Sequence, residues 1–221
     1  RCARQALAQG GEEVHELLPL GGDRLPIWPS GWVGCISHSA GTAIAMVGPS
    51  AIYRGVGIDV EALIKSPVLE SIRPGVATVE EMACTGVQDQ SLALTLIFSG
   101  KEALFKALYP QVRRILDFSA AQLVSISEEW MEFVLAEDWS SVWRAGCRFL
   151  VRYAVYEGHV YTAVLVPRTE SCTDGIDCHD LCGGSEHAQD YEGEAGPALL
   201  VGSSNGRKLT AASTVKVVHE L

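Results

Sequence analysis

Short apolar runs bounded by glycine and proline recur in two parts of the chain and predict β-strands. A hairpin turn is predicted at Glu157-Gly158, between the last two of these runs. The predicted strands lie around residues 32–37, 42–47, 56–60, 122–125, 131–135, 148–156 and 160–166.

Three segments predict helices. Residues 1–8 have a helical composition, and a second helical region runs through Glu70 and resumes over residues 78–84. The longest helix is predicted over residues 92–108 and is expected to end at Tyr109-Pro110, because proline cannot continue a helix. Since helices and strands are interleaved and some strands form hairpins, the pattern predicts an α+β fold rather than a doubly wound parallel sheet.

The last quarter of the chain, residues 168–221, loses this periodicity and is expected to be mostly disordered. Only residues 197–201 and 213–218 look capable of local structure. Cysteines and histidines in this tail could bind zinc, but their spacing matches no standard zinc-site pattern, so an extension without a metal is the simpler interpretation. The residues concerned are Cys172, Cys178, His179, Cys182 and His187.

Composition narrows the class of protein. With 221 residues, 48% of them hydrophobic, the chain can bury a core as one large domain or two small ones. No run approaches the roughly 18–20 consecutive apolar residues of a membrane-spanning helix, so we expect no membrane span. A net charge of −10 disfavours general binding to nucleic acid or to an anionic membrane, but a local basic cluster could still hold a phosphate ligand.

The start of the chain shows no signal peptide, which would combine a charged segment with an apolar one. The first residue is Arg1 rather than methionine, so we expect a processed chain or one that lacks its natural start. Without an export signal or a pairing pattern, the cysteines are expected to be free thiols in a reducing cytoplasm. Those of the main body are Cys2, Cys35, Cys84 and Cys147.

Two carboxylates, Asp59 and Glu61, lie two positions apart in the sequence Gly-Ile-Asp-Val-Glu. On a strand such residues point to the same face, so the pair would project together while Ile58 and Val60 face a core. Carboxylates repel one another unless a cation lies between them, and Mg²⁺ commonly binds one or two carboxylates together with substrate phosphates. Ordinary charges on a solvent-facing strand would give the same pattern.

The predicted helix over residues 92–108 carries Glu102 and Lys106 four positions apart, on one face. In a functional interpretation, Glu102 would add a third carboxylate to the possible metal-binding pair Asp59 and Glu61. Lys101 and Lys106 would then supply cations for phosphate oxygens. A surface ion pair worth a few tenths of a kcal/mol explains the same spacing.

Two further groups of residues could contact an anion. His38 follows Ser37 at the end of a predicted strand, where it could bind a phosphate or act as an acid or base. A lone histidine is also common as a structural residue. Arg1 and Arg4 are spaced as neighbours on a helix face and, with Arg24, could clamp an anion. A solvated helix face explains these arginines equally well.

The four segments form a series along the chain. They read R-x-x-R at residues 1–4, W-P-x-G-x-x-G-x-x-x-H-S at 28–39, G-I-D-V-E at 57–61 and F-S-x-K-E-A-L-F-K-A-L at 98–108. This series resembles the signature motifs of the 4′-phosphopantetheinyl transferases, most closely the enterobactin-synthetase component D branch of the surfactin-synthetase type. The resemblance runs from residue 1 to about residue 167, and the last two motifs are its most specific part.

The resemblance implies a pseudo-dimer of two related α/β subdomains with the active site in the cleft between them. We expect an N-terminal subdomain over residues 1–57, truncated at its start, and a C-terminal subdomain over residues 58–167. The implied reaction transfers the phosphopantetheine arm of coenzyme A to a serine of an apo acyl or peptidyl carrier protein. It requires Mg²⁺, for which Mn²⁺ could substitute, and yields adenosine 3′,5′-bisphosphate. The carriers would serve nonribosomal peptide (including siderophore), polyketide or fatty-acid synthesis, and the enzyme is expected to be a monomer.

The same resemblance gives the candidate residues their roles. Glu102, or a water on the metal, would take the proton of the carrier serine, and Lys106 would support the leaving phosphate. The implied metal ligands are Asp59, Glu61 and Glu102. The implied catalytic residues are Glu102, Lys106 and His38. The implied contacts to coenzyme A are Arg1, Arg4, Arg24, Ser37, His38, Lys101 and Lys106.

Two other functions stay open on these residues. A divalent-metal phosphohydrolase acting on a nucleotide-like substrate would use the same carboxylates and lysines. A non-catalytic fragment that only binds coenzyme A would keep the same contacts. The sequence departs from the family pattern at Cys35, where the family commonly has a small hydroxyl residue, and we expect a thiol of similar size to be tolerated there.

Overall fold

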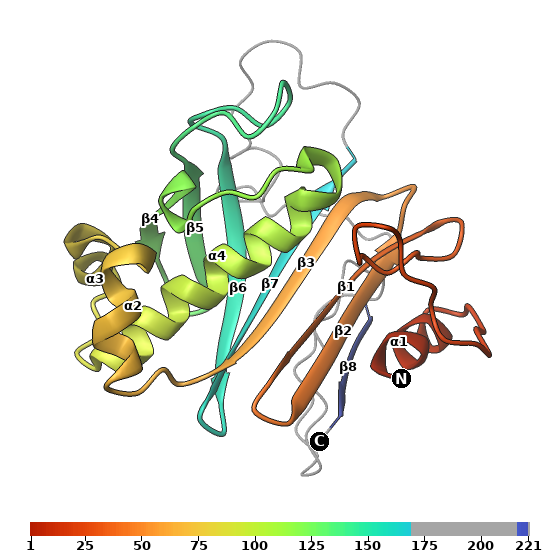
Figure 1. Ribbon diagram of the computed structural model, residues 1–221, viewed down its shortest axis with the longest axis horizontal. Helices are drawn as coiled ribbons and strands as arrows, with labels where there is room; N and C mark the ends of the chain where they lie inside the picture. Colours follow the sequence, from red (N-terminus) through yellow and green to blue (C-terminus); the bar gives the residue numbers. More distant parts are fainter. Residues whose placement is uncertain (169–215, 221) are drawn as a thin grey trace, which may run out of the picture.

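The computed structural model describes residues 1–168 and 216–220 (Figure 1). The strands of these residues form two antiparallel sheets with helices packed against them, which confirms the predicted α+β class. The smaller sheet has the order β1-β2-β8 and consists of β1 (Trp32–Ser39), β2 (Thr42–Pro49) and β8 (Lys216–Glu220). The larger has the order β3-β7-β6-β5-β4 and consists of β3 (Tyr53–Ala62), β7 (His159–Pro167), β6 (Arg148–Tyr156), β5 (Trp130–Leu135) and β4 (Ala121–Ile126).

Each sheet packs against a helix, as expected for two α/β subdomains (Figure 1). The short helix α1 (Cys2–Gln9) lies on the smaller sheet, where Ala6 and Leu7 are completely buried against β2. The long helix α4 (Gln90–Val112) crosses one face of the larger sheet, over β3 and β7. Three short helices near α4 complete the fold, namely α2 (Val68–Val76), α3 (Val79–Cys84) and η1 (Phe118–Ala120).

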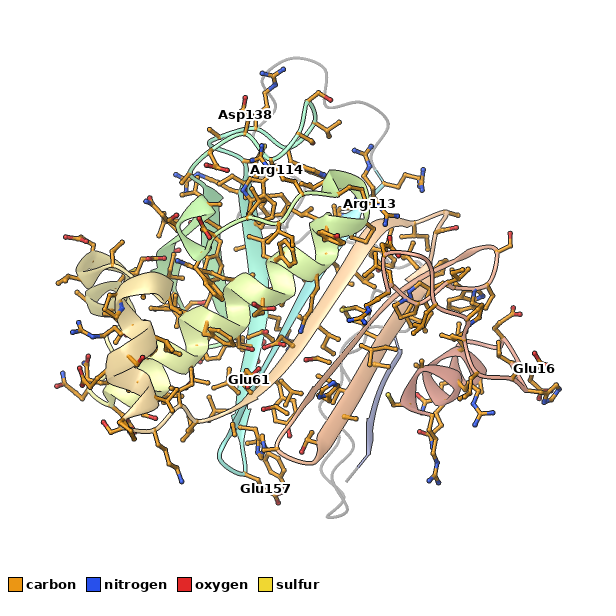
Figure 2. The ribbon with its side chains drawn as sticks, viewed as in Figure 1. Glu16, Glu61, Arg113, Arg114, Asp138 and Glu157 are labelled. Carbon is orange, nitrogen blue, oxygen red and sulfur yellow. The ribbon has the colours of Figure 1, made fainter. Side chains whose placement is uncertain are left out.

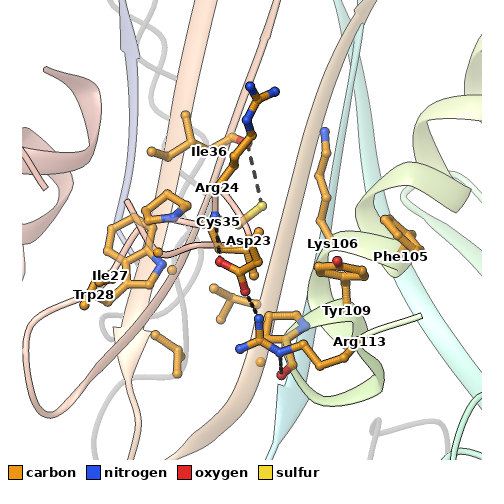
Figure 3. Close-up of a pocket in the computed structure, with 18 of the residues that line it drawn as sticks. Asp23, Arg24, Ile27, Trp28, Cys35, Ile36, Phe105, Lys106, Tyr109 and Arg113 are labelled. Atoms are coloured by element: carbon orange, nitrogen blue, oxygen red, sulfur yellow. Dashed lines mark hydrogen bonds and ion pairs between the residues drawn. The ribbon is translucent and has the colours of Figure 1, made fainter. Parts of the chain in front are cut away.

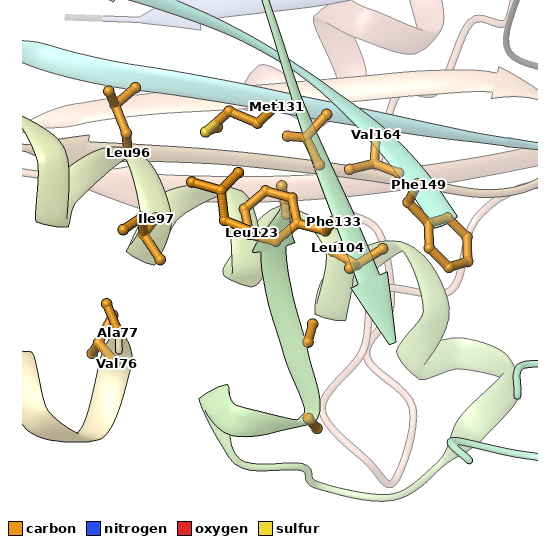
Figure 4. Close-up of a cluster of buried hydrophobic side chains, with 14 of the residues drawn as sticks. Val76, Ala77, Leu96, Ile97, Leu104, Leu123, Met131, Phe133, Phe149 and Val164 are labelled. Carbon is orange, nitrogen blue, oxygen red and sulfur yellow. The ribbon is translucent and has the colours of Figure 1, made fainter. Parts of the chain in front are cut away.

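The largest core lies between α4 and the larger sheet (Figure 4). Leu96, Ile97 and Leu104 of α4 meet Met131 and Phe133 of β5, and all five side chains are at most 1% exposed. Burying large apolar side chains of this kind contributes roughly 1.5–3 kcal/mol each. This contact therefore fixes the position of α4 on the sheet, and with it the position of the polar residues that α4 carries.

Two glycines of β3 allow α4 to come unusually close to that strand. A Cβ atom at Gly57 would collide with the carbonyl oxygen of Ala103, and one at Gly55 would collide with that of Ala107. Only residues without a side chain fit at these two positions. Because Gly57 precedes Asp59 by two residues on the same strand, the close approach also brings α4 next to the Asp59 carboxylate.

Helix α4 is longer than predicted. It begins at an N-cap, Asp89, whose side chain accepts hydrogen bonds from the backbone N–H groups of Ser91 and Leu92. It continues through Pro110 to Val112 rather than ending before the proline. A proline in the last turn removes only one hydrogen bond, and the left-handed residue Arg113, whose N–H donates to the carbonyl of Tyr109, then ends the helix.

The predicted hairpin turn is confirmed. Glu157 and Gly158 both have positive φ angles, 47° and 73°, and join Tyr156 of β6 directly to His159 of β7. A two-residue turn with this geometry matches the twist of the strands that it connects. The last two predicted strands therefore form a hairpin in the middle of the larger sheet.

The subdomain boundary predicted between residues 57 and 58 lies within β3, which pairs with β7 from Tyr53 to Ala62. We propose instead that the two subdomains divide in the turn between β2 and β3. Most of the predicted tail lies outside the described residues, apart from Arg168 and the strand β8, which pairs with β2. None of the helices in the described ranges is long and apolar enough to cross a membrane.

Candidate active site

The two sheets meet along a seam between β1 and β3, which run side by side (Figure 1). Two serine hydroxyls of β1 bridge this seam. Ser37 donates a hydrogen bond to Oδ1 of Asp59, and Ser39 donates one to Oε2 of Glu61, each at 2.8 Å. Both hydroxyls also accept from backbone N–H groups of β3 at 3.4 Å. The alternation that puts Asp59 and Glu61 on one face of β3 thus matches an alternation of serines on β1.

Asp59 is the most buried of the candidate carboxylates, with an exposed fraction of 1%. Its Oδ1 atom also lies 2.6 Å from the Lys106 ammonium, and its Oδ2 accepts from the Ser99 hydroxyl at 2.8 Å. Burial alone would lower the pKa of Lys106, but the Asp59 charge and its hydrogen bond raise that pKa above its usual value. Lys106 is therefore a firmly protonated cation next to Asp59.

Glu61 and Glu102 are partly buried close to Asp59, and each has a raised pKa. Burial is the main cause for both residues. For Glu102 the nearby charges of Asp59 and Glu61 raise the pKa further, while Lys106 lowers it. The three carboxylates thus form one cluster, called here the carboxylate cluster, in which a single ammonium opposes three acidic groups.

The carboxylate cluster suits a hard divalent cation in its donor chemistry. Its oxygen atoms are the ligands that Mg²⁺ prefers, and its excess of acid would be relieved by positive charge. Within the described ranges, no three histidine, cysteine or acidic side chains are grouped closely enough to hold an ion by themselves. A metal here would need ligands from a bound substrate as well, as Mg²⁺ sites commonly do.

A cavity of about 990 Å³ lies beside the seam, between β1, β3 and the C-terminal half of α4 (Figure 3). Aromatic side chains line it from two sides, with Trp28 and Trp32 at the entry to β1 and Phe105 and Tyr109 on α4. The charged residues of the lining are mostly basic. They are Arg24, Arg54, Lys106 and Arg113, with Asp23 as the one acid. In a chain with a net charge of −10, this is a local basic cluster suited to an anionic ligand.

Asp23 and Arg113 form an ion pair at the edge of this cavity (Figure 3). The pair joins the loop before β1 to the C-terminal end of α4, and so connects the two subdomains. Arg113 has a left-handed backbone, with φ at 56°, and so has the neighbouring cavity residue Arg24, with φ at 64°. Non-glycine residues seldom adopt this conformation, and at Arg113 it ends α4 and directs the side chain to Asp23.

Lys106 is the residue that the cavity and the carboxylate cluster share. Its side chain lines the cavity, and its ammonium contacts both Asp59 and, at 3.1 Å, the Ser37 hydroxyl. Figure 2 shows Glu61 and Arg113 towards opposite ends of the seam, with α4 alongside. The structure therefore brings together Asp59, Glu61, Glu102, Lys106 and Ser37, with Arg24 in the adjoining cavity.

Lys101 is not brought to this site. Its ammonium is buried in an ion pair with Glu81 at 2.7 Å and donates to the carbonyl oxygen of Val76 at 2.9 Å. Glu81 also accepts from the backbone N–H groups of Leu123 and Thr78, both at 2.9 Å. Lys101 therefore connects α2, α3 and β4 to α4, and in this structure its ammonium is not available to a phosphate in the cavity.

The remaining candidates lie outside the cavity lining. His38 is exposed at the end of β1, where its charge would lower the pKa of Glu61, although burial outweighs this effect. Arg1 lies at the start of α1, and Arg4 donates to the carbonyl oxygen of His15 at 2.7 Å. Of the three candidate arginines, only Arg24 therefore lines the cavity, whereas Arg1 and Arg4 lie at α1.

Sequence patterns missed four polar residues of this region. Ser39 follows Ser37 at the same two-residue spacing that separates Glu61 from Asp59. Ser99 lies within the F-S-x-K-E motif, so both residues left a signal in the sequence. Arg54 and Arg113 left none, because they reach the cavity only through the packing of α4 on β3.

Comparisons with known proteins agree with the motifs. Residues 1–48 match the model of the 4′-phosphopantetheinyl transferase N-terminal domain, and residues 55–160 match that of the 4′-phosphopantetheinyl transferase superfamily. A solved holo-[acyl-carrier-protein] synthase from Thermotoga maritima aligns with a TM-score of 0.40 and 21% identity, over 53% of this chain and 65% of that chain.

Three curated relatives carry the same family name or that of the expected branch. The 4′-phosphopantetheinyl transferase Npt of Nocardia iowensis is 37% identical over 55% of this chain and 54% of its own length. PptT of Mycobacterium tuberculosis is 35% identical over 55% of this chain and 53% of its own length. Enterobactin synthase component D of Salmonella typhi is 32% identical over 57% of this chain and 52% of its own length. The chain spans about half the length of these relatives. Since the two family models together account for almost all of residues 1–160, the chain belongs to the 4′-phosphopantetheinyl transferase superfamily.

Proposed function

We propose that this protein transfers the 4′-phosphopantetheine arm of coenzyme A to a serine of an apo acyl or peptidyl carrier protein and releases adenosine 3′,5′-bisphosphate. The observation that carries the proposal is that Lys106 belongs both to the cavity and to the carboxylate cluster. One residue lines a basic cavity large enough for a nucleotide-like cofactor and also contacts Asp59, the buried member of the carboxylate cluster. Phosphoryl-type transfer requires such a combination, because it depends on charge neutralisation and positioning more than on covalent catalysis.

The basic cavity accounts for the binding of coenzyme A. Its phosphates would lie near Arg24, Arg54 and Arg113, and the aromatic side chains of the lining offer flat surfaces for the adenine ring. Lys106 would reach the diphosphate from the side of the carboxylate cluster. We retain Ser37 and His38 as proposed phosphate contacts, because they lie on β1 beside this end of the cavity. The roles of Arg1 and Arg4 as contacts to coenzyme A are also part of the proposal.

Mg²⁺ is the proposed cofactor, with Asp59, Glu61 and Glu102 as its protein ligands. When bound, it would neutralise the charge that develops on the diphosphate. The pKa values of Glu61 and Glu102 are raised mainly by burial and further by neighbouring carboxylates, and a bound cation would offset both effects. Mn²⁺ prefers the same oxygen ligands and is proposed as a substitute.

The protein's own residues account for the proton and the leaving group. The serine oxygen of the carrier forms a bond to the phosphorus that bears the pantetheine arm, and the bond from that phosphorus to the bridging oxygen breaks. We assign Glu102 as the acceptor of the serine proton, because it is partly exposed and shares a face of α4 with Lys106, which would contact the same diphosphate. Lys106 would stabilise the negative charge on the departing adenosine 3′,5′-bisphosphate.

The relatives named for enterobactin synthase suggest carriers of nonribosomal peptide synthesis as substrates. Carriers of polyketide and fatty-acid synthesis are further candidates. We place the activity in the cytoplasm, in a monomeric enzyme.

Intact-protein mass spectrometry of a panel of apo carriers tests this function. With coenzyme A and Mg²⁺, one carrier should gain the mass of a single phosphopantetheine group, and its serine-to-alanine variant should not. Consumption of coenzyme A without any carrier would indicate a phosphohydrolase instead. Retention of coenzyme A without either product would indicate a binding fragment, and both results would contradict the transferase proposal.

A further inference from the structure

Two hydroxyl groups that the proposed reaction does not use lie on the core side of Asp59. Ser99 of α4 is completely buried and donates to Oδ2 of Asp59 at 2.8 Å. Thr162 of β7 is 1% exposed, and its Oγ1 lies 2.9 Å from both the hydroxyl and the carbonyl oxygen of Ser99. Thr162 is also the direct partner of Asp59 in the pairing of β3 with β7, which places both side chains on the same face of the sheet.

The number of available protons fixes the direction of these hydrogen bonds. An ionised carboxylate only accepts, so the single hydroxyl proton of Ser99 is given to Asp59. Thr162 also has a single hydroxyl proton, and it donates that proton to the carbonyl oxygen of Ser99, which can only accept. Thr162 thus holds the backbone of Ser99, and the Ser99 hydroxyl in turn donates to one carboxylate oxygen of Asp59, Oδ2.

The other oxygen of Asp59 has different partners. Oδ1 accepts from Ser37 at 2.8 Å and from Lys106 at 2.6 Å, and Lys106 lines the cavity. One oxygen thus faces the ligand side and the other faces the core. Because bonds to both oxygens determine the plane of a carboxylate, the hydroxyl of Ser99, whose backbone Thr162 holds, affects how Oδ1 is presented.

Buried hydroxyl groups are costly unless they are satisfied, and an apolar pair would pack at these two positions without any such requirement. We propose that Ser99 and Thr162 are positioning residues that orient Asp59 for cation binding. This inference rests on the proposed function, which makes Asp59 a metal ligand. Residues that hold a metal ligand in place typically affect metal affinity by about 10–100-fold.

Binding of Mn²⁺ alone, followed by the electron paramagnetic resonance signal of the free ion, tests the inference on the full chain. The titration is done with and without coenzyme A. Ser99→Ala should weaken Mn²⁺ binding by about tenfold or more, and Ser99→Thr, which keeps the hydroxyl, should restore it. Thr162→Val should cause a smaller loss in the same direction, and Thr162→Ser should reverse that loss.

Thr95→Ala is the matched control. Thr95 is completely buried on the same helix, one turn before Ser99, and its hydroxyl bonds Ser91 and the backbone N–H of Ile64 rather than Asp59. This variant should lose stability but bind Mn²⁺ as the wild type does. If Ser99→Ala does not fold, Thr162→Val decides the outcome.

The results separate this inference from the proposed function. Wild-type Mn²⁺ binding that Asp59→Asn abolishes, together with unchanged binding in Ser99→Ala, would overturn the positioning role alone. Equal losses in Thr95→Ala and Ser99→Ala would also overturn it, since they would indicate a general effect of burial. If the wild type bound no Mn²⁺ through Asp59 under either condition, the proposed metal role would fail and the positioning role with it.

Discussion

The Lys106 ammonium lies 2.6 Å from Oδ1 of Asp59, so a buried carboxylate and a cavity-lining cation are paired directly. Asp59 is 1% exposed and Lys106 is 27% exposed. The pair is therefore closed on the side of Asp59 and open on the side of the cavity. A divalent cation that binds Asp59 as proposed must compete with this ammonium.

Lys106→Met should destabilise the protein by about 3 kcal/mol, near the lower end of the range for removing one partner of a buried ion pair. The reason is that Asp59 keeps its buried charge and loses its closest cation. Mg²⁺ should recover part of this loss, and should raise the melting temperature of Lys106→Met more than that of the wild type. Thermal and urea unfolding with and without Mg²⁺ measure both effects.

Lys65→Met is the control for Lys106→Met, because Lys65 is an exposed lysine that undergoes the same chemical change. It should alter stability by less than about 0.5 kcal/mol, as surface substitutions usually do. Equal stability of the two variants would contradict the energetic importance of the Lys106–Asp59 pair.

Glu102→Gln should abolish transfer and yet stabilise the fold at pH 7. Burial and the neighbouring carboxylates raise the pKa of Glu102 above its usual 4.5, so the native state binds more protons than the unfolded state just above that pH. The contribution of this group to stability is complete below its usual pKa and is lost as the pH rises through the native pKa. We expect a gain of about 0.5–1 kcal/mol at pH 7, typical of removing one unfavourable charge.

Urea unfolding at several pH values measures this effect, and the difference between Glu102→Gln and the wild type should shrink as the pH falls towards 4.5. Glu128→Gln, at an exposed position, should show no such gain. A Glu102→Gln variant that is active, or that is less stable than the wild type at pH 7, would contradict the proposed site.

Asp23→Asn should tighten the binding of coenzyme A by roughly 3- to 10-fold, the effect of a typical exposed charge interaction in a partly enclosed site. Asp23 is the one acid among the cavity-lining residues, and it pairs with Arg113. Its removal would free Arg113 for the ligand, whereas Arg113→Gln should weaken binding by a similar factor. Isothermal titration calorimetry at low and high salt measures both changes, which should diminish as salt rises.

The neighbouring pair Arg114–Glu137 is the control for the Asp23–Arg113 pair. It is also an exposed ion pair, with nitrogen and oxygen 2.8 Å apart, but neither residue lines the cavity. Glu137→Gln and Arg114→Gln should leave the affinity for coenzyme A unchanged. A change as large as that of Asp23→Asn would mean that net charge, rather than the position of Asp23, determines the effect.

Local patterns predicted much of this fold because their causes are local. The alternation of Asp59 and Glu61 and the turn at Glu157-Gly158 depend on backbone geometry that neighbouring residues determine. The predicted extent of α4 was wrong because its cause is not local. Tertiary packing lets the helix continue past Pro110. Arg113 reaches the cavity from beyond that point, so its place in the site could not be predicted from spacing.

Lys101 shows how a motif can group residues that the helix separates. Glu102 and Lys106 are four positions apart and share a face of α4, whereas Lys101 precedes Glu102 by one position and points elsewhere. It faces the core, where it meets Glu81. Membership in one motif therefore does not imply a shared site, and the geometry of the helix distinguishes the two cases.

Lys101→Met should consequently act on stability rather than on ligand binding. Both partners of the Lys101–Glu81 pair are buried, with exposed fractions of 3% and 4%, so removing the ammonium leaves an uncompensated carboxylate and should cost about 3–5 kcal/mol. The double variant Lys101→Met, Glu81→Gln should regain part of that loss, because no buried charge remains. Calorimetric binding of coenzyme A, measured below the melting temperature, should change less than twofold in either variant. If Lys101→Met instead weakened coenzyme A binding strongly at little cost in stability, Lys101 would have to leave Glu81 and contact the ligand.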